Sequence, residues 1–233
     1  GLLTRIATPF KLLKAVWQAK KVINSVKPDV VLGMGGYASA PGGLAAWLSN
    51  IPLIVHEQNA AAGLTNRLLA KFANKVCCAF PNAFSHDINA EVVGNPLRAT
   101  ILEEQGSVTS PNNDLGEASF AAKNILVVGG SLGAQVLNNV IPLAFNQLKS
   151  TYPDIAIWHQ TGKNKKENVF STYNSAKGEK DNVKVSEFID NMAQAYAWAD
   201  VVICRAGALT VSELAMASKP AIFVPLPHAV DDH

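Results

Sequence analysis

Cysteine, charge and long apolar runs are all scarce in this chain of 233 residues. Of its three cysteines, Cys77 and Cys78 are adjacent, and no CxxC spacing occurs, so we expect neither a disulfide framework nor a zinc site. Such usage is typical of a reducing cytoplasm. The longest apolar stretches, such as residues 51–55, are far shorter than the roughly 18 residues that a membrane span requires. We therefore expect no span.

Only 16% of the residues are charged and 48% are apolar, which is the profile of a folded protein. The net charge of +2 is too small to indicate a nucleic-acid partner. The charge is unevenly distributed, however, because residues 1–28 contain no acidic residue. They carry six basic residues: Arg5, Lys11, Lys14, Lys20, Lys21 and Lys27.

Short apolar runs alternate with stretches able to form helices, in two series. The first has strands expected at 30–32, 53–55, 76–80 and 91–93, and the second at 125–128, 155–158, 183–185, 201–204 and 221–224. Continuous apolar strands between helices predict parallel sheets covered on both faces. We therefore expect an α/β protein with two Rossmann-like domains, 1–96 and 97–233, with a surface loop or linker over 103–122.

The first domain is expected to begin with an amphipathic helix. Thr8 and Pro9 resemble an N-cap and the first helical position. One face carries apolar residues at steps of four and three, namely Leu12, Val16, Ala19, Ile23 and Val26. Two further helices are expected over 41–49 and 65–72.

A glycine-rich turn at 129–134 follows the strand at 125–128 and precedes a helix. Its glycines allow close backbone approach to an anion, and Ser131 with the helix N–H groups can hold a diphosphate; a tight turn that needs glycine for its geometry alone is equally compatible. The spacing is not GxGxxG, and the next strand ends without an acidic residue, which disfavours NAD. Lys163 after Gly162 is followed by Asn164, which disfavours an ATP-binding P-loop. A second phosphate-type loop occupies 33–37, with Pro41, Gly42 and Gly43 behind it.

A third strand, turn and helix covers 205–213. Thr210 and Glu213 have the spacing of a capping box, in which Glu213 only reaches back to the cap N–H. The alternative is that Glu213 accepts hydrogen bonds from sugar or ribose hydroxyls. The sequence leaves both interpretations open.

Taken together, these motifs resemble the MurG family of bacterial glycosyltransferases. The match runs in the family's order from about Pro9 to His233, through GMGGY at 33, HEQN at 56, VGNPLR at 93, GGSLGA at 129, EFIDNM at 187 and RAGALTVSE at 205. The resemblance implies the GT-B fold, in which two Rossmann-like domains face a central cleft. The N-terminal domain would hold a lipid acceptor and the C-terminal domain the UDP-sugar.

The resemblance also implies which residues bind UDP-N-acetylglucosamine. Arg98 and Ser131 would contact the diphosphate region, Ile189 the uracil, Glu213 the ribose, and Asn59 the donor sugar from the other domain. The segment at 208–212 would contact diphosphate and sugar through Ala208, Leu209, Thr210, Val211 and Ser212. Gly35, Gly36 and Tyr37 would form the loop for the acceptor diphosphate. Plainer roles stay open: Ile189 as core, Arg98 as a surface ion-pair partner, Asn59 as a turn residue.

Two parts of the family pattern have no counterpart here. The family begins with a glycine-rich loop ending in a histidine, a candidate general base, and a glutamine-rich donor-binding segment follows the position of His233. We therefore expect the chain to be part of a longer protein and to have little activity alone. No catalytic base is assigned, and His56 and Glu57 are interpreted as structural hydrogen-bonding residues at a strand end.

The implied reaction is direct displacement at the anomeric carbon, with inversion, UDP as leaving group and lipid II as product. No DxD pair occurs, so neither metal nor cofactor is expected. The resemblance places the protein on the cytoplasmic face of the bacterial inner membrane, in peptidoglycan synthesis, cell shape and division. The first helix would contact anionic lipid through Lys11, Leu13, Lys14 and Trp17, unless it only packs on the sheet. A UDP-N-acetylglucosamine 2-epimerase and a nonenzymatic nucleotide-sugar-binding module remain alternatives.

Overall fold

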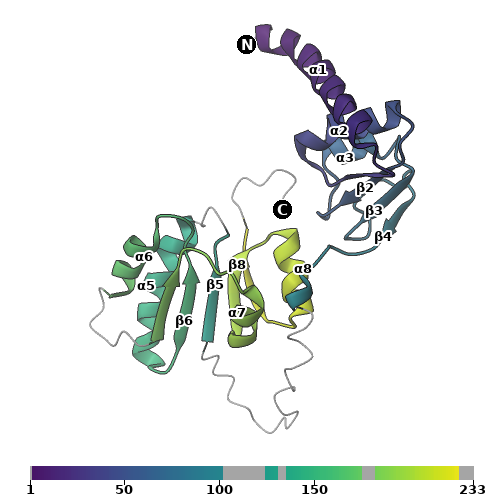
Figure 1. Cartoon of the computed structure of the whole chain (residues 1–233). Helices are drawn as coiled ribbons and strands as arrows, with labels where there is room; N and C mark the ends of the chain where they lie inside the picture. Colours follow the sequence, from purple (N-terminus) through teal and green to yellow (C-terminus); the bar gives the residue numbers. More distant parts are fainter. Residues whose placement is uncertain (1, 102–123, 131–134, 175–181, 226–233) are drawn as a thin grey trace. The chain divides into compact units, whose positions relative to one another are not determined.

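Parallel strands and helices make up both halves of the computed structural model, which describes residues 2–101, 124–130, 135–174 and 182–225 (Figure 1). The predicted loop at 103–122 and Ser131 lie outside the described residues. The chain divides into two compact units, Gly1–Pro96 and Leu97–His233. The acceptor and donor roles expected of these two units stay predictions.

The first unit holds a four-stranded parallel sheet in the order β1-β2-β3-β4. Its strands are β1 (Val31–Gly33), β2 (Leu53–Glu57), β3 (Lys75–Cys78) and β4 (Ala90–Val92), and its helices are α1 (Leu2–Val26), α2 (Gly36–Leu48) and α3 (Leu64–Leu69). All four predicted strands of this unit are present, each within three residues of its expected ends. Apolar strand residues, with Leu53 and Val55 fully buried, form its core with α3.

Helix α1 starts earlier than predicted, and less of its predicted apolar face is covered. It begins at Leu2 rather than at Pro9, so the Thr8-Pro9 pair does not start the helix. Of the expected apolar face, only the middle is covered: Ile23 is buried against α2, and Val16 and Ala19 pack beside it. Leu12 and Val26 are exposed because α2 contacts only part of the long helix.

The loop after β1 is shorter than the glycine pattern predicts, because helix α2 already begins at Gly36. The turn itself consists of Met34 and Gly35, and Gly35 has a φ of +83°, which favours glycine. Pro41, Gly42 and Gly43 lie inside α2, as the helix predicted over 41–49 requires. Gly43 faces Leu69 of α3 so closely that an added Cβ would lie 2.7 Å from Leu69 Cδ2. The absence of a side chain there lets α2 and α3 pack together.

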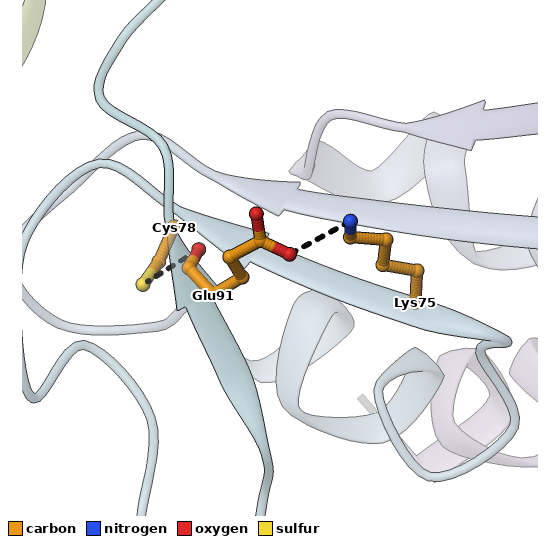
Figure 2. Close-up of polar contacts among 3 residues, drawn as sticks. All are labelled: Lys75, Cys78 and Glu91. Atoms are coloured by element: carbon orange, nitrogen blue, oxygen red, sulfur yellow. Dashed lines mark hydrogen bonds and ion pairs between the residues drawn. The ribbon is translucent and has the colours of Figure 1, made fainter.

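Strand β4 is attached to β3 by parallel backbone pairing and by one ion pair at its edge. Lys75 Nζ lies 2.7 Å from Glu91 Oε2, and Figure 2 shows the two side chains meeting across the strands. Both side chains are more than half exposed, so the pair contributes only about 0–1 kcal/mol. The buried Cys78 directs its Sγ at the Glu91 carbonyl, 3.7 Å away, and burial raises the pKa of this thiol.

The second unit holds a five-stranded parallel sheet in the order β7-β6-β5-β8-β9. Its strands are β5 (Asn124–Val128), β6 (Ala156–Gln160), β7 (Val183–Ser186), β8 (Val201–Arg205) and β9 (Ala221–Val224). Its helices are α5 (Gln135–Thr151), α6 (Lys166–Asn174), α7 (Met192–Trp198) and α8 (Ala208–Met216). The chain proceeds outward from β5 to β7 on one side and from β8 to β9 on the other. The strand order therefore reverses between β5 and β8, the point where open α/β sheets bind ligands.

Alternate residues of β5 face opposite sides of this sheet. Ile125 and Val127 belong to a core with α5 and α6, whereas Leu126 belongs to a core with α7 and α8. Figure 1 shows these two pairs of helices on either side of the strands. Both faces are covered, which is why the strands are continuous apolar runs.

Candidate functional site

The second unit has a cavity of about 720 Å³ at the carboxyl ends of its central strands. Val128 ends β5 and Gln160 ends β6, and α8 follows β8, so the cavity lies at the reversal of strand order. Among the residues that the structure describes, the lining consists of Arg98, Val128, Gly130, Gln160, Phe188, Ile189, Asp190, Met192, Tyr196, Leu209, Thr210 and Glu213. A cavity lined by both apolar and polar side chains, at this place in the fold, is typical of a small-molecule site.

Glu213, an acidic residue of the cavity wall, is held by two neighbouring side chains. Its Oε2 accepts a hydrogen bond from the hydroxyl of Tyr196 at 3.0 Å. Its Oε1 lies 3.9 Å from Nε of Arg98, and the Glu213 side chain is 15% exposed against 60% for Arg98. Burial, and then the neighbouring Glu213, raise the pKa of Tyr196 well above its usual range, so the hydroxyl stays protonated and keeps donating.

The capping-box interpretation of Thr210 and Glu213 is wrong. The N-cap of α8 is Gly207, and Glu213 lies on the second turn of the helix, bonded to Tyr196. Because Gly207 has no side chain, no capping side chain bonds the first N–H groups of α8.

Five of the residues predicted to bind the donor line the same cavity: Arg98, Ile189, Leu209, Thr210 and Glu213. Ala208 is the first residue of α8. Val211 and Ser212 lie on the same helix but not on the cavity, and the Ser212 hydroxyl donates to the Ala208 carbonyl. Ile189 is 8% exposed and also belongs to the core, so both of its interpretations apply. Whether any of them contacts a donor stays a prediction.

Sequence reasoning did not single out Tyr196, Phe188 or Gln160, which also line the cavity. Gln160 is the last residue of β6, and strand-end position was the available signal. Tyr196 sits in a seven-residue helix with apolar neighbours, where nothing in the pattern distinguishes it from a core residue.

In the first unit, the buried Glu57 organises the turn after β2. Its Oε1 accepts from the backbone N–H and the side-chain amide of Asn59, at 2.9 and 3.1 Å. Its Oε2 accepts from the N–H of Gly63 at 3.1 Å and from Asn66 Nδ2 at 2.9 Å. His56 contacts the Gly94 carbonyl through Nε2 at 2.9 Å. The structural interpretation of His56 and Glu57 fits these contacts, and Asn59 is the turn residue that one interpretation anticipated.

The predicted acceptor loop also lies in the first unit. Gly35 is the N-cap of α2 and Gly36 its first residue, and an added Cβ on Gly35 would lie 3.3 Å from Asn66 Nδ2. The side chain of Tyr37 is 98% exposed. Asn66 thus links the loop after β1 to the Glu57 network.

The predicted membrane residues lie on α1. The side chains of Leu13 and Trp17 are exposed by more than half, and those of Lys11 and Lys14 are exposed as well. Lys21 Nζ lies 3.5 Å from the ring centre of Trp17, a cation–π contact. Within the described residues, no helix has the length and apolar character needed to cross a membrane.

Comparison with known proteins decides the family. Residues 2–78 match the glycosyltransferase family 28 N-terminal domain, and residues 124–233 match the glycosyltransferase family 28 C-terminal domain. The chain belongs to glycosyltransferase family 28. The family's C-terminal domain model covers most of the cavity lining, and its N-terminal model covers the Glu57 network.

Family relatives extend beyond this chain. A protein of Colwellia psychrerythraea, named UDP-N-acetylglucosamine--N-acetylmuramyl-(pentapeptide) pyrophosphoryl-undecaprenol N-acetylglucosamine transferase, is 65% identical over 233 residues. A protein of the same name from Shewanella frigidimarina is 53% identical. Both matches include all of this chain, which spans 59% and 61% of the length of those two relatives.

Solved structures agree with this assignment. The crystal structure of Acinetobacter baumannii MurG is 43% identical, with a TM-score of 0.72, and the match covers 97% of this chain and 60% of that one. The UDP-N-acetylglucosamine 2-epimerase from Neisseria meningitidis is 16% identical with a TM-score of 0.60, covering 91% and 63% of the two chains. At that identity the epimerase shares only the fold. The two units are the two Rossmann-like domains of a GT-B fold.

Proposed function

We propose that this chain is the part of a longer enzyme that transfers N-acetylglucosamine from UDP-N-acetylglucosamine to a lipid-linked muramyl-peptide acceptor. The product is lipid II, and the anomeric configuration is inverted. The names of the Colwellia and Shewanella relatives support the choice of donor and acceptor. The observation that carries the proposal is the cavity at the ends of β5 and β8, with Glu213 and Arg98 at its wall.

In this proposal the cavity holds the UDP moiety. The uracil ring lies near Ile189 and Phe188, where an apolar wall accompanies the backbone groups that would hydrogen-bond its edge. The carboxylate of Glu213 accepts hydrogen bonds from the ribose hydroxyls, since a carboxylate has acceptor capacity beyond its bond to Tyr196.

The leaving diphosphate gains negative charge as the glycosidic bond breaks. The guanidinium of Arg98 and the N–H groups at the start of α8, from Ala208 to Thr210, are proposed to stabilise that charge, which the cavity position of Arg98 and Thr210 supports. Ser131 would add a hydroxyl to the same diphosphate. This chemistry is the stabilisation of a leaving group by fixed donors, and we assign no catalytic base.

The first unit supplies the acceptor side. Gly35, Gly36 and Tyr37 are proposed to bind the acceptor diphosphate, and Asn59 the donor sugar. The Glu57 network supports this role, because it fixes the backbone and side chain of Asn59 in one geometry. Helix α1 is proposed to contact anionic lipid through Lys11, Leu13, Lys14 and Trp17, placing the enzyme peripherally on the cytoplasmic face of the inner membrane. The enzyme thereby serves peptidoglycan synthesis, and through it cell shape and division.

The experiment that tests this function uses a chimera in which the chain replaces the matching 233 residues of the Colwellia relative. UDP release from UDP-N-acetylglucosamine is measured with and without a lipid-linked muramyl-peptide analogue. The proposal expects release that depends on the acceptor, together with a disaccharide product. Conversion of the donor to another sugar without acceptor would support an epimerase instead, and binding without turnover would support a nonenzymatic module.

A further inference from the structure

Besides Arg98, the carboxylate of Glu213 contacts Tyr196, a residue that lies outside the sequence motifs. Glu213 lies on α8 and its side chain has three rotatable bonds, so holding the carboxylate in one place costs conformational entropy. The hydroxyl of Tyr196, on α7, reaches Oε2 at 3.0 Å and offsets that cost. The two helices meet at the wall of the cavity that both residues line.

Tyr196 is itself immobilised by packing. The residue is 2% exposed and lies in the core formed with Leu126, Val202 and Leu214. A ring held in a packed core presents its hydroxyl at a fixed point, so the oxygen of Glu213 bonded to it is fixed as well.

The arrangement leaves the other oxygen available. Oε1 lies 3.9 Å from Arg98 Nε, which is longer than a hydrogen bond. The Arg98 side chain is 60% exposed, so this contact is weak and solvent-screened. One oxygen is therefore anchored by the core, while the other lies near Arg98, which also lines the cavity, and can accept from a ligand hydroxyl.

We propose that Tyr196 is a positioning residue for the nucleotide, acting through Glu213. The inference rests on the proposed function, because it assumes that Glu213 accepts the ribose hydroxyls of UDP. The Tyr196 hydroxyl acts on the nucleotide only through Glu213. It sets the rotamer of the Glu213 side chain before the nucleotide arrives. Binding therefore loses no conformational entropy of that side chain, which raises the affinity.

The test is calorimetric titration of the chain with UDP and with 2′,3′-dideoxy-UDP, which lacks the ribose hydroxyls. Y196F keeps the ring and removes only the hydroxyl. We expect this variant to bind UDP about tenfold more weakly, the effect of losing about 1.4 kcal/mol at a charge-assisted hydrogen bond, and to bind the dideoxy analogue within about twofold of wild type. Y173F is the matched control, because Tyr173 is also buried in this unit but bonds His159 and does not line the cavity. It should leave both affinities unchanged.

If Y196F weakens the binding of both ligands equally, the hydroxyl only supports the fold of the cavity. If Y196F weakens neither, Glu213 does not depend on the hydroxyl. Either result overturns the proposal. The double variant Y196F/E213Q gives a second reading. If Tyr196 acts through Glu213, the double variant binds UDP as E213Q does, whereas additive losses contradict that route. A wild-type chain that binds the dideoxy analogue as tightly as UDP would contradict the ribose role of Glu213, and one that binds neither would contradict the proposed donor site itself.

Discussion

The side-chain amide of Asn66 donates to Glu57 Oε2 at 2.9 Å, in the interior of the first unit. Both residues are buried, at 2% and 3% exposure, so the carboxylate of Glu57 is removed from water and held by four N–H donors. A buried carboxylate is tolerated when it is bonded in this way. The turn that carries Asn59 depends on it.

Glu57→Gln is therefore expected to destabilise the first unit by about 2–3 kcal/mol, because an amide group must then face N–H donors that the carboxylate now satisfies. Amide hydrogen exchange of strand β2 measures this loss. Glu91→Gln is the control, since the exposed Lys75–Glu91 pair should contribute less than about 1 kcal/mol (Figure 2). Equal effects of the two substitutions would contradict the importance of the network.

Two adjacent glycines of α2 should respond oppositely to alanine. An added Cβ at Gly43 would lie 2.7 Å from Leu69 Cδ2, and Leu69 is 2% exposed, so Gly43→Ala should destabilise by about 1–3 kcal/mol through overpacking. An added Cβ at Gly42 meets no atom within 4 Å, so Gly42→Ala should stabilise by about 0.5–1 kcal/mol through helix propensity. Thermal denaturation compares the stabilities of the two variants. A Gly43→Ala variant as stable as Gly42→Ala would show that α2 and α3 leave room for a side chain at position 43.

Acid should destabilise the second unit through His159. This residue is fully buried, its Nδ1 lies 2.7 Å from the Tyr173 hydroxyl, and burial lowers the pKa of its imidazole to about 4. The unfolded chain takes up the proton near pH 6.5, before the folded one does, so stability falls as the pH drops from about 6.5 to about 4 and is not lost further below that. The free energy of unfolding lost over this pH interval is about 3 kcal/mol.

Urea denaturation of wild type and H159Q at pH 7 and pH 4.5 isolates this contribution. Gln does not titrate, so H159Q should lose less stability than wild type over that interval. The same loss in both proteins would show that His159 is not the group responsible.

Contact of α1 with anionic lipid predicts a charge effect. K11E/K14E should weaken binding to phosphatidylglycerol vesicles by at least about tenfold, since each nearby cation contributes about 1 kcal/mol and the reversal adds repulsion. K163E/K166E makes the same charge change at two exposed lysines of the second unit. A loss that is equal in the two double variants would indicate a general effect of net charge, and binding unchanged in K11E/K14E would contradict a role for α1.

Strand positions could be predicted because buried parallel strands are continuous apolar runs, as at 125–128 and 221–224. The first residues of helices were harder to predict from the sequence. Nothing local to Thr8 and Pro9 shows that α1 begins at Leu2, and the glycines at 35 and 36 resemble a longer loop although α2 begins at Gly36. In both cases the helix extends through residues whose own preferences favour a boundary.

The site was predictable where its residues lie in contiguous motifs. Leu209, Thr210 and Glu213 follow a strand, and Arg98 lies in a recognisable motif. Tyr196 was not predictable, because its contact with Glu213 joins residues 17 positions apart through tertiary packing. The spacing of Thr210 and Glu213 suggested a capping box, which the N-cap position of Gly207 and the bond of Glu213 to Tyr196 exclude.

The most direct test of the central claim is acceptor-dependent UDP release by the chimera with the Colwellia relative, compared with the same chimera carrying E213Q. The account predicts release only when the lipid-linked acceptor is present, and a higher KM for UDP-N-acetylglucosamine in E213Q. Release that is independent of acceptor, or a KM that E213Q leaves unchanged, would contradict the assignment of the cavity to the donor of a transferase.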